Sequence, residues 1–199
     1  MINKIGLLFS HMHVRGGEEY KFDILEHNIN SFRKFKCDFY IVVSGHGIVL
    51  PENILRKIDE CYWENTIDRQ EIGRGHPKFC KEGYKRLAQN NINKSLKLRF
   101  CDFIQNENLF YELLDKSSIT LTEQTSIKRR MIGDLLMFGN THETLALWSA
   151  LPWDYSKSGL YNLYDNAEYL AMSNNLNVVE YLKSKFLYVS PEDIGWYSY

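Results

Sequence analysis

Short apolar runs separated by amphipathic stretches dominate the first part of the chain. The segment KIGLLFS (4–10) is short and apolar with a polar end, which is typical of a buried strand. Apolar residues recur every three to four positions within 18–35, and this spacing predicts a helix with one apolar face. CDFYIVVSGHG (37–47) predicts a second buried strand that closes on a glycine turn. A strand, a helix and a strand in this order indicate a βαβ unit.

The same alternation continues through the middle of the chain. Proline at its first position favours a helix over 51–61, and a second helix is predicted over 77–89 after a loop. KSLKLRFC (94–101) predicts the third strand. NENLFYELLDK (106–116) predicts a helix with Asn106 as its cap.

The second half of the chain predicts a change of strand direction. SITLTE (118–123) and GDLLMFG (133–139) are strand patterns with no helix between them, so we expect antiparallel neighbours in a mixed sheet. Helices are predicted over 141–151, opened by a cap-like Thr-x-Glu turn, and near 165–173 and 176–187, before the aromatic tail at 195–199. The fold class predicted is α/β, a single domain with a mixed sheet flanked by helices.

Composition narrows the class of protein. The chain has 199 residues, 44% of them apolar and 14% aromatic, which suits one globular domain. A net charge of −1 argues against a nucleic-acid partner bound by bulk charge. The N-terminal apolar run (5–9) is too short for a signal peptide or a transmembrane segment. The four cysteines are widely spaced without a CxxC pair, which favours reduced thiols in a cytoplasmic protein.

Polar residues gather where the predicted strands end. Ligands of open α/β sheets bind beyond the carboxyl ends of the strands, and guanidinium groups bind phosphates in a bidentate manner. We therefore expect a nucleotide diphosphate at this edge; the simpler alternative is that charged residues merely populate loops. The candidate binding residues are His11, Arg15, Ser44, Arg74, Lys78, Arg99 and Asp102.

One block of sequence is more specific. GYKRLAQNNINKSLKLRFCDFIQNENLF (83–110) resembles the segment of GT-A-type glycosyltransferases in which a helix leads into a strand that ends on metal-binding acids. The resemblance is greatest to the WavE-type transferases of lipopolysaccharide synthesis. In that family the strand reads Lys-x-Arg, then a small residue and Asp. The matching positions here are Lys97, Arg99 and then either Cys101 or Asp102.

Three further blocks follow the order of the same family. RMIGDLLMFGNTHETLALW (130–148) resembles its aspartate, aromatic-rich strand, Phe-Gly turn and helix ending in Leu-Trp. DNAEYLAMS (165–173) resembles its late acidic helix, with Glu168 at the acid. HNINSFRKFKCDFYIVVSG (27–45) has the helix-to-strand form of the nucleotide-binding half. The blocks together cover most of the chain.

The resemblance implies a single GT-A-like, Rossmann-related domain over 1–199, with a nucleotide-binding half (1–102) and an acceptor half (103–199). It implies a nucleotide-sugar donor and a glycan or lipopolysaccharide-type acceptor. Such an acceptor fits a cytoplasmic protein working at the inner face of a membrane.

The metal expected in this family is Mn²⁺ or Mg²⁺, with Asp102 as its ligand. The second acid is missing, because Cys101 stands in its place and a thiol is a poor ligand for hard cations. Three outcomes stay open: Asp102 holds the metal with water and phosphate; cations such as Arg15, Arg74, Lys78 or Arg99 replace it; or transfer activity is lost. Arg99 and Asp102 can also pair with each other, provided that the strand ends between them.

Two acids are candidates for catalysis. An inverting transferase needs a general base near the acceptor hydroxyl. Asp134 is the first candidate because it precedes a buried strand and matches the family's aspartate, and Glu168 is the second. The alternative for Asp134 is a turn or cap role. Trp148 and Trp153 are candidates for stacking on a sugar, with the core as the alternative.

Two rival functions remain. His11 and His13 follow a strand, as in metal-dependent phosphoesterases. His46 and His76 could supply further ligands, and Asp102 or Asp134 the acid. Against this reading, the second strand lacks an acid-His pair. A non-catalytic binding module is the other rival, with the aromatic tail (196–199) docking on a partner or closing the chain's own fold.

Overall fold

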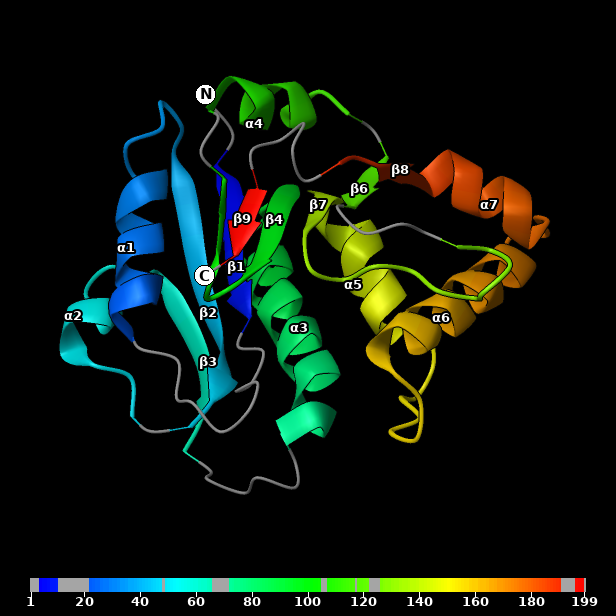
Figure 1. The fold of residues 1–199 in the computed structure, drawn as a ribbon, viewed down its shortest axis with the longest axis horizontal. Coiled ribbons are helices and arrows are strands. Elements are labelled where there is room, and N and C mark those ends of the chain that lie inside the picture. Colours follow the sequence, from blue (N-terminus) through cyan, green and yellow to red (C-terminus); the bar gives the residue numbers. More distant parts are fainter. Residues whose placement is uncertain are drawn as a thin grey trace.

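A seven-stranded mixed sheet forms the centre of the computed structural model, with strand order β3-β2-β1-β4-β7-β6-β8 (Figure 1). The structure describes residues 4–10, 22–47, 49–65, 72–104, 107–116, 118–121, 126–190 and 196–198. Four strands form a continuous parallel part of the sheet: β1 (Ile5–Ser10), β2 (Phe39–His46), β3 (Glu60–Glu64) and β4 (Lys94–Arg99). The remaining strands of this sheet are β6 (Ile119–Leu121), β7 (Met137–Asn140) and β8 (Phe186–Tyr188).

Helices cover both faces of the sheet because successive strand residues point to opposite sides. Figure 1 shows α1 and α2 on one side of the parallel strands and α3 on the other. The first face carries α1 (Phe22–Phe32), α2 (Glu52–Leu55) and α4 (Glu107–Leu114). The second face carries α3 (Ile72–Gln89), α5 (Thr141–Ser149), α6 (Gly159–Ser173) and α7 (Val178–Lys185). Each face has its own apolar core.

Neighbouring side chains of a single strand belong to the cores on opposite faces of the sheet. Leu7 and Phe9 of β1 belong to the core under α1, whereas Leu8 belongs to the core under α3. Gly83 lets α3 lie very close to β1, since a Cβ at this position would come within 2.3 Å of the Leu8 side chain. This close approach brings α3 tightly against the face of the sheet.

The predicted mixed sheet is confirmed. β6 and β7 are antiparallel neighbours, and β7 is also antiparallel to β4. The aromatic tail closes the chain's own fold, because β9 (Trp196–Ser198) pairs antiparallel with β5 (Asp102–Ile104). Within the described residues, no helix has the length and apolar character needed to cross a membrane.

Several predicted element bounds are wrong. The helix expected over 51–61 ends at Leu55. β3 follows it instead of further helix, because residues 60–64 pair in parallel with β2 as an edge strand. α3 begins at Ile72 instead of 77, with Pro77 inside it. The strand expected over 133–139 starts at Met137, which leaves Asp134 in an irregular segment.

The later helices also differ from the prediction. α5 is capped by Asn140, whose side-chain oxygen accepts hydrogen bonds from the backbone N–H of His142 (2.9 Å) and Glu143 (3.1 Å), and not by the Thr-x-Glu turn. α6 starts at Gly159, earlier than predicted, and α7 ends at Lys185 where β8 takes over. The cap predicted at position 106 lies outside the described residues.

Candidate functional site

The strand order places a switch point between β1 and β4. The chain leaves β1 toward β2 and β3 on one side and returns to β4 on the other, and ligands of open α/β sheets bind in the crevice at such a point. Ser10 at the end of β1 pairs in register with Ser44 of β2 and Arg99 of β4. Two predicted binding residues therefore lie in one row across the crevice. The Ser44 hydroxyl donates to the backbone carbonyl of Phe79 on α3 (2.6 Å).

Arg99 and Asp102 form a bidentate ion pair. The Arg99 Nε and Nη2 donate to the two Asp102 carboxylate oxygens, each at 2.8 Å, and the Arg99 backbone N–H donates at 3.2 Å. This pairing is possible because β4 ends at Arg99 and β5 begins at Asp102, so the strand does end between them. Asp102 is fully buried, and the Cys101 thiol lies 3.7 Å from it. Both carboxylate oxygens are thus engaged by one guanidinium.

A buried asparagine anchors the same turn to α1. The Asn28 Nδ2 donates to the backbone carbonyls of Phe100 (2.5 Å) and Asp102 (3.1 Å), and Asn28 is fully buried. The turn between β4 and β5 is therefore anchored to α1.

Asp134 lies at the meeting point of three elements. Its Oδ2 lies 3.0 Å from Nε2 of His76 on α3. The Lys97 Nζ on β4 donates to the Asp134 backbone carbonyl. A Cβ at Gly159 would lie 3.6 Å from Oδ2, so the carboxylate sits at the first residue of α6, where the helix dipole favours negative charge. Asp134 is 7% exposed, His76 8% and Lys97 0%.

The charges of this group stabilise one another. Burial opposes ionisation of Asp134, but Lys97 and His76 outweigh it and hold the pKa of the carboxyl well below its usual range. Burial likewise opposes protonation of His76, and the neighbouring Cys80 and Asp134 outweigh it and raise the pKa of His76 to about 9. At neutral pH the pair is therefore carboxylate and imidazolium.

Cys80 extends the same group along α3. Its Sγ lies 3.5 Å from the His76 Nε2, one helical turn away. Burial raises the pKa of the thiol, but His76 and Lys97 outweigh burial, and the net pKa is lowered. We call His76, Cys80, Lys97 and Asp134 the Asp134 cluster.

The charge state bears on the predicted catalytic role of Asp134. A general base works best when its pKa is near the working pH, and the low pKa makes Asp134 a weak proton acceptor. Its position favours a different role, which is to hold two cations close to the strand edge. The position of the carboxylate at the start of α6 agrees with the cap alternative, and the contact with His76 comes in addition to it.

Trp148 and Trp153 pack in the core, which was the alternative to stacking on a sugar. Trp148 is fully buried on α5, with its ring edge against His76 at 5.8 Å between centroids. The two indoles stack at 5.2 Å, and the Trp153 Nε1 donates to the Trp148 carbonyl.

The remaining predicted residues divide into three groups. His11 and Arg15, with His13, lie outside the described residues. Arg74 lies in the first turn of α3. Lys78, also on α3, is half-exposed and forms an ion pair with Glu64 at the end of β3 (2.5 Å).

Glu168 lies apart from the Asp134 cluster. It is nine residues beyond Gly159 on α6, which is about 14 Å along the helix axis. Its carboxylate accepts a hydrogen bond from the Arg130 Nη2 at 2.6 Å and lines a pocket of about 500 Å³.

Sequence reasoning missed Cys80 as a member of the site and gave Lys97 only as a match to the transferase family. It brought His76 and Asp134 together only as candidate metal ligands of the phosphoesterase alternative. A signal for Lys97 was present: Ser95, Lys97 and Arg99 alternate with leucines, so a lysine occupies one face of a buried strand. His76 and Cys80 are four residues apart and share a helix face.

The donors of the described residues do not form a metal site. No group of three or more His, Cys, Asp or Glu side chains in this part of the chain is arranged to hold an ion. The histidines at 11 and 13, on which the phosphoesterase prediction depends, are not among them.

Comparisons with known proteins give a fold. No protein-family model matches the chain, and no curated protein matches it. The crystal structure of a 4-diphosphocytidyl-2C-methyl-D-erythritol synthase is similar, with a TM-score of 0.53 and 10% sequence identity over 96% of this chain and 92% of that one. The chain therefore has a single-domain α/β fold, a mixed sheet flanked by helices, like that of the similar structure.

Proposed function

We propose that this chain is a glycosyltransferase that moves a sugar from a nucleotide-sugar donor to a glycan or lipopolysaccharide-type acceptor. The observation that carries the proposal is the Asp134 cluster, a buried carboxylate with two cations beside the switch point of a nucleotide-binding type of sheet. The resemblance of four sequence blocks to one transferase family supports the same function. The name of the similar structure contains a diphosphocytidyl group, and this likeness supports a nucleotide substrate in the proposal.

The donor diphosphate is assigned to the crevice outside β1 and β4. Arg99 lies at this edge with its guanidinium fixed in one orientation by Asp102. His11, Arg15, Arg74 and Lys78 are the further phosphate contacts of the proposal. In this arrangement the nucleotide lies over the first half of the chain (1–102) and the acceptor over the second half (103–199).

Asp102 fits the expected Mn²⁺ or Mg²⁺ poorly. Hard cations need several oxygen ligands, but Arg99 engages both Asp102 oxygens and the neighbouring residue is Cys101. We therefore assign stabilisation of the departing diphosphate to cations, as guanidinium and ammonium groups can carry this charge.

The role of Asp134 in the proposal is electrostatic. The carboxylate, together with Cys80, keeps His76 protonated, and the Asp134 backbone carbonyl accepts a hydrogen bond from the Lys97 ammonium. These cations lie next to the strand edge where negative charge develops on the leaving group. Because the charges are already in place, little reorganisation accompanies the reaction.

Thermal shift with UDP-, GDP- and CDP-sugars, each with and without Mn²⁺, tests the proposal. A donor at 100 times its Kd stabilises the folded chain by about 2.7 kcal/mol, which corresponds to a rise in Tm of roughly 5–10 °C for a domain of this size. Stabilisation by one nucleotide sugar above the others supports the proposal. If no nucleotide or nucleotide sugar raises Tm, the proposal is wrong. Stoichiometric zinc or manganese in the purified protein would then favour the phosphoesterase.

A further inference from the structure

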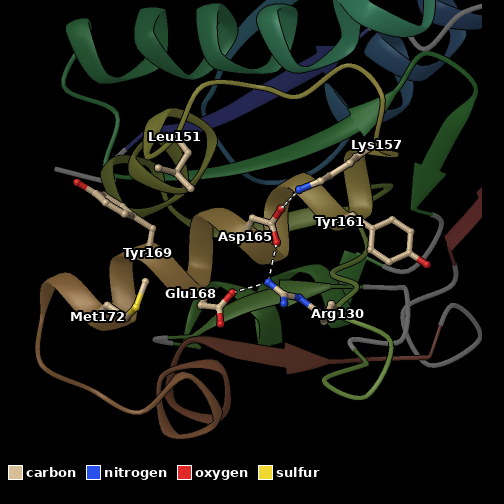
Figure 2. Close-up of a pocket in the computed structure, with 8 residues that line it drawn as sticks. All are labelled: Arg130, Leu151, Lys157, Tyr161, Asp165, Glu168, Tyr169 and Met172. Atoms are coloured by element: carbon tan, nitrogen blue, oxygen red, sulfur yellow. Dashed lines mark hydrogen bonds and ion pairs between the residues drawn. The ribbon is translucent and has the colours of Figure 1, made fainter.

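An open pocket of about 500 Å³ lies along one face of α6 (Figure 2). We call it the α6 pocket. Its polar and aromatic lining comes from Arg130, Lys157, Tyr161, Asp165, Glu168 and Tyr169. The volume is within the range of sites that bind small organic ligands.

Ion pairs form the polar part of the α6 pocket. The Arg130 Nη2 donates to Asp165 (3.0 Å) and to Glu168 (2.6 Å), and the Lys157 Nζ donates to the other Asp165 oxygen (2.8 Å). Two carboxylates and two cations give this lining a formal charge of zero. An anionic phosphate would find no excess positive charge here, whereas a neutral molecule rich in hydroxyl groups could use both donors and acceptors.

Aromatic rings flank the ion pairs. Figure 2 shows Tyr161 and Tyr169 on opposite sides of them. These tyrosines are 42% and 44% exposed, and Met172, on the same side as Tyr169, is 63% exposed. Exposed aromatic and apolar side chains around a polar centre mark binding surfaces, and tyrosine combines a flat apolar face with a polar tip.

Arg130 adds an independent sign of function. Its φ angle of 51° is in the left-handed region, which is uncommon for a residue other than glycine. Its guanidinium lies 5.2 Å above the ring of Tyr164, in addition to its two ion pairs. Strained backbone that holds a side chain in one place is concentrated at binding sites.

The α6 pocket is connected to the Asp134 cluster. Tyr161 is two residues from Gly159, against which the Asp134 carboxylate packs, so the two positions lie on different sides of α6. The Ile132 N–H donates to the Leu160 carbonyl, so the segment from Arg130 to Asp134 runs beside the start of α6. The pocket and the Asp134 cluster therefore share the 130–134 segment but lie on different sides of α6.

We propose that the α6 pocket binds a neutral oligosaccharide, which serves as the acceptor. This inference rests on the proposed function and names the substrate class of its second half. It also gives Glu168 a different role from the predicted base: Glu168 holds Arg130 in the pocket, and the two tyrosines stack on sugar rings.

Binding of neutral oligosaccharides to the full chain, measured on a glycan array and then by calorimetry, tests the inference. The double variant Tyr161→Ala/Tyr169→Ala should weaken binding of the selected glycan at least about tenfold. The variant Tyr161→Phe/Tyr169→Phe, which keeps the ring faces, should stay within about threefold of wild type. Tyr188→Ala is the matched control, because Tyr188 is 49% exposed on β8 and does not line the pocket.

The donor is measured on the same variants. The thermal shift given by nucleotide sugars should be unchanged in all of them. If the alanine double variant binds the glycan as wild type does, or if the protein selects acidic ligands and no neutral glycan, the inference is wrong even when donor binding is intact. If glycan binding is lost in that variant while no nucleotide sugar binds wild type, the pocket is supported and the transferase is not.

Discussion

Replacing Asp134 by asparagine removes the anion from the Asp134 cluster and keeps its shape. The carboxylate is 7% exposed and lies 3.0 Å from the His76 Nε2, so the variant leaves the imidazolium and Lys97 without their buried counter-charge. Breaking a buried pair from one side costs about 3–5 kcal/mol. His76 can relieve part of this cost by releasing its proton. We therefore expect a loss of about 3 kcal/mol in unfolding free energy at pH 7, or about 6–12 °C in Tm.

The pKa shifts of His76 and Asp134 predict the direction in which stability changes with pH. The pKa of His76 is raised from 6.5 to about 9, so the stability that its charge contributes is complete below pH 6.5 and is lost as pH rises through about 9. At about 1.4 kcal/mol per pKa unit, the wild type should lose about 3 kcal/mol across this window. Asp134 has a lowered pKa, so its contribution is present above about pH 4 and is lost only in stronger acid.

Urea unfolding at half-unit steps from pH 6 to pH 9.5 measures both effects, with tryptophan fluorescence as the signal. Asp134→Asn should lower stability at pH 7 and flatten the alkaline decline, because His76 is then less strongly held in its charged form. Asp154→Asn is the control, since the Asp154 side chain is 49% exposed and its loss should change stability by less than about 0.5 kcal/mol. If the wild type and Asp134→Asn are equally stable at pH 7 and their unfolding free energies fall in parallel as pH rises, the buried charge pair is refuted.

Three further substitutions test how the site is held. Asn28→Ala removes two hydrogen bonds to carbonyls of the β4–β5 turn and should cost about 2–3 kcal/mol in urea unfolding. Arg99→Lys keeps the charge but loses the fork that binds Asp102, so unfolding free energy should fall by about 1–3 kcal/mol; Arg56→Lys, in an exposed pair, should change it by less than about 0.5 kcal/mol. Asn140→Ala removes the cap of α5 and should cost about 1 kcal/mol, whereas Asn140→Ser should be nearly neutral; equal stability of the two variants would contradict the cap.

The sheet could be predicted because its main strands have recognisable patterns in the sequence. The apolar runs at β1, β2 and β4 are long enough to identify, and the missing helix between β6 and β7 predicts their antiparallel pairing. β3 could not be separated from a helix, since its five residues are partly exposed and gain their structure from pairing with β2. Short edge strands depend on the neighbour more than on their own pattern.

The site was less predictable because its pairs are distant in sequence. Arg99 and Asp102 are three residues apart, and the sequence predicts that they pair if the strand ends between them. His76 and Asp134 are separated by 58 residues, and neither residue type indicates a partner on its own. Arg130 has a left-handed backbone, and the start of α6 lies beside Asp134. Both features result from tertiary packing, which cannot be read from a single sequence.

Product formation tests the central claim most directly. The full chain is incubated with the nucleotide sugar that gives the largest thermal shift and with a neutral glycan that it binds, and release of the nucleoside diphosphate is followed together with the mass of the glycan. The account predicts that the diphosphate is released and that the glycan gains one sugar, and that Asp134→Asn slows both at least about a hundredfold. Absence of any glycan mass gain with every donor that binds, or full activity of Asp134→Asn, would contradict it.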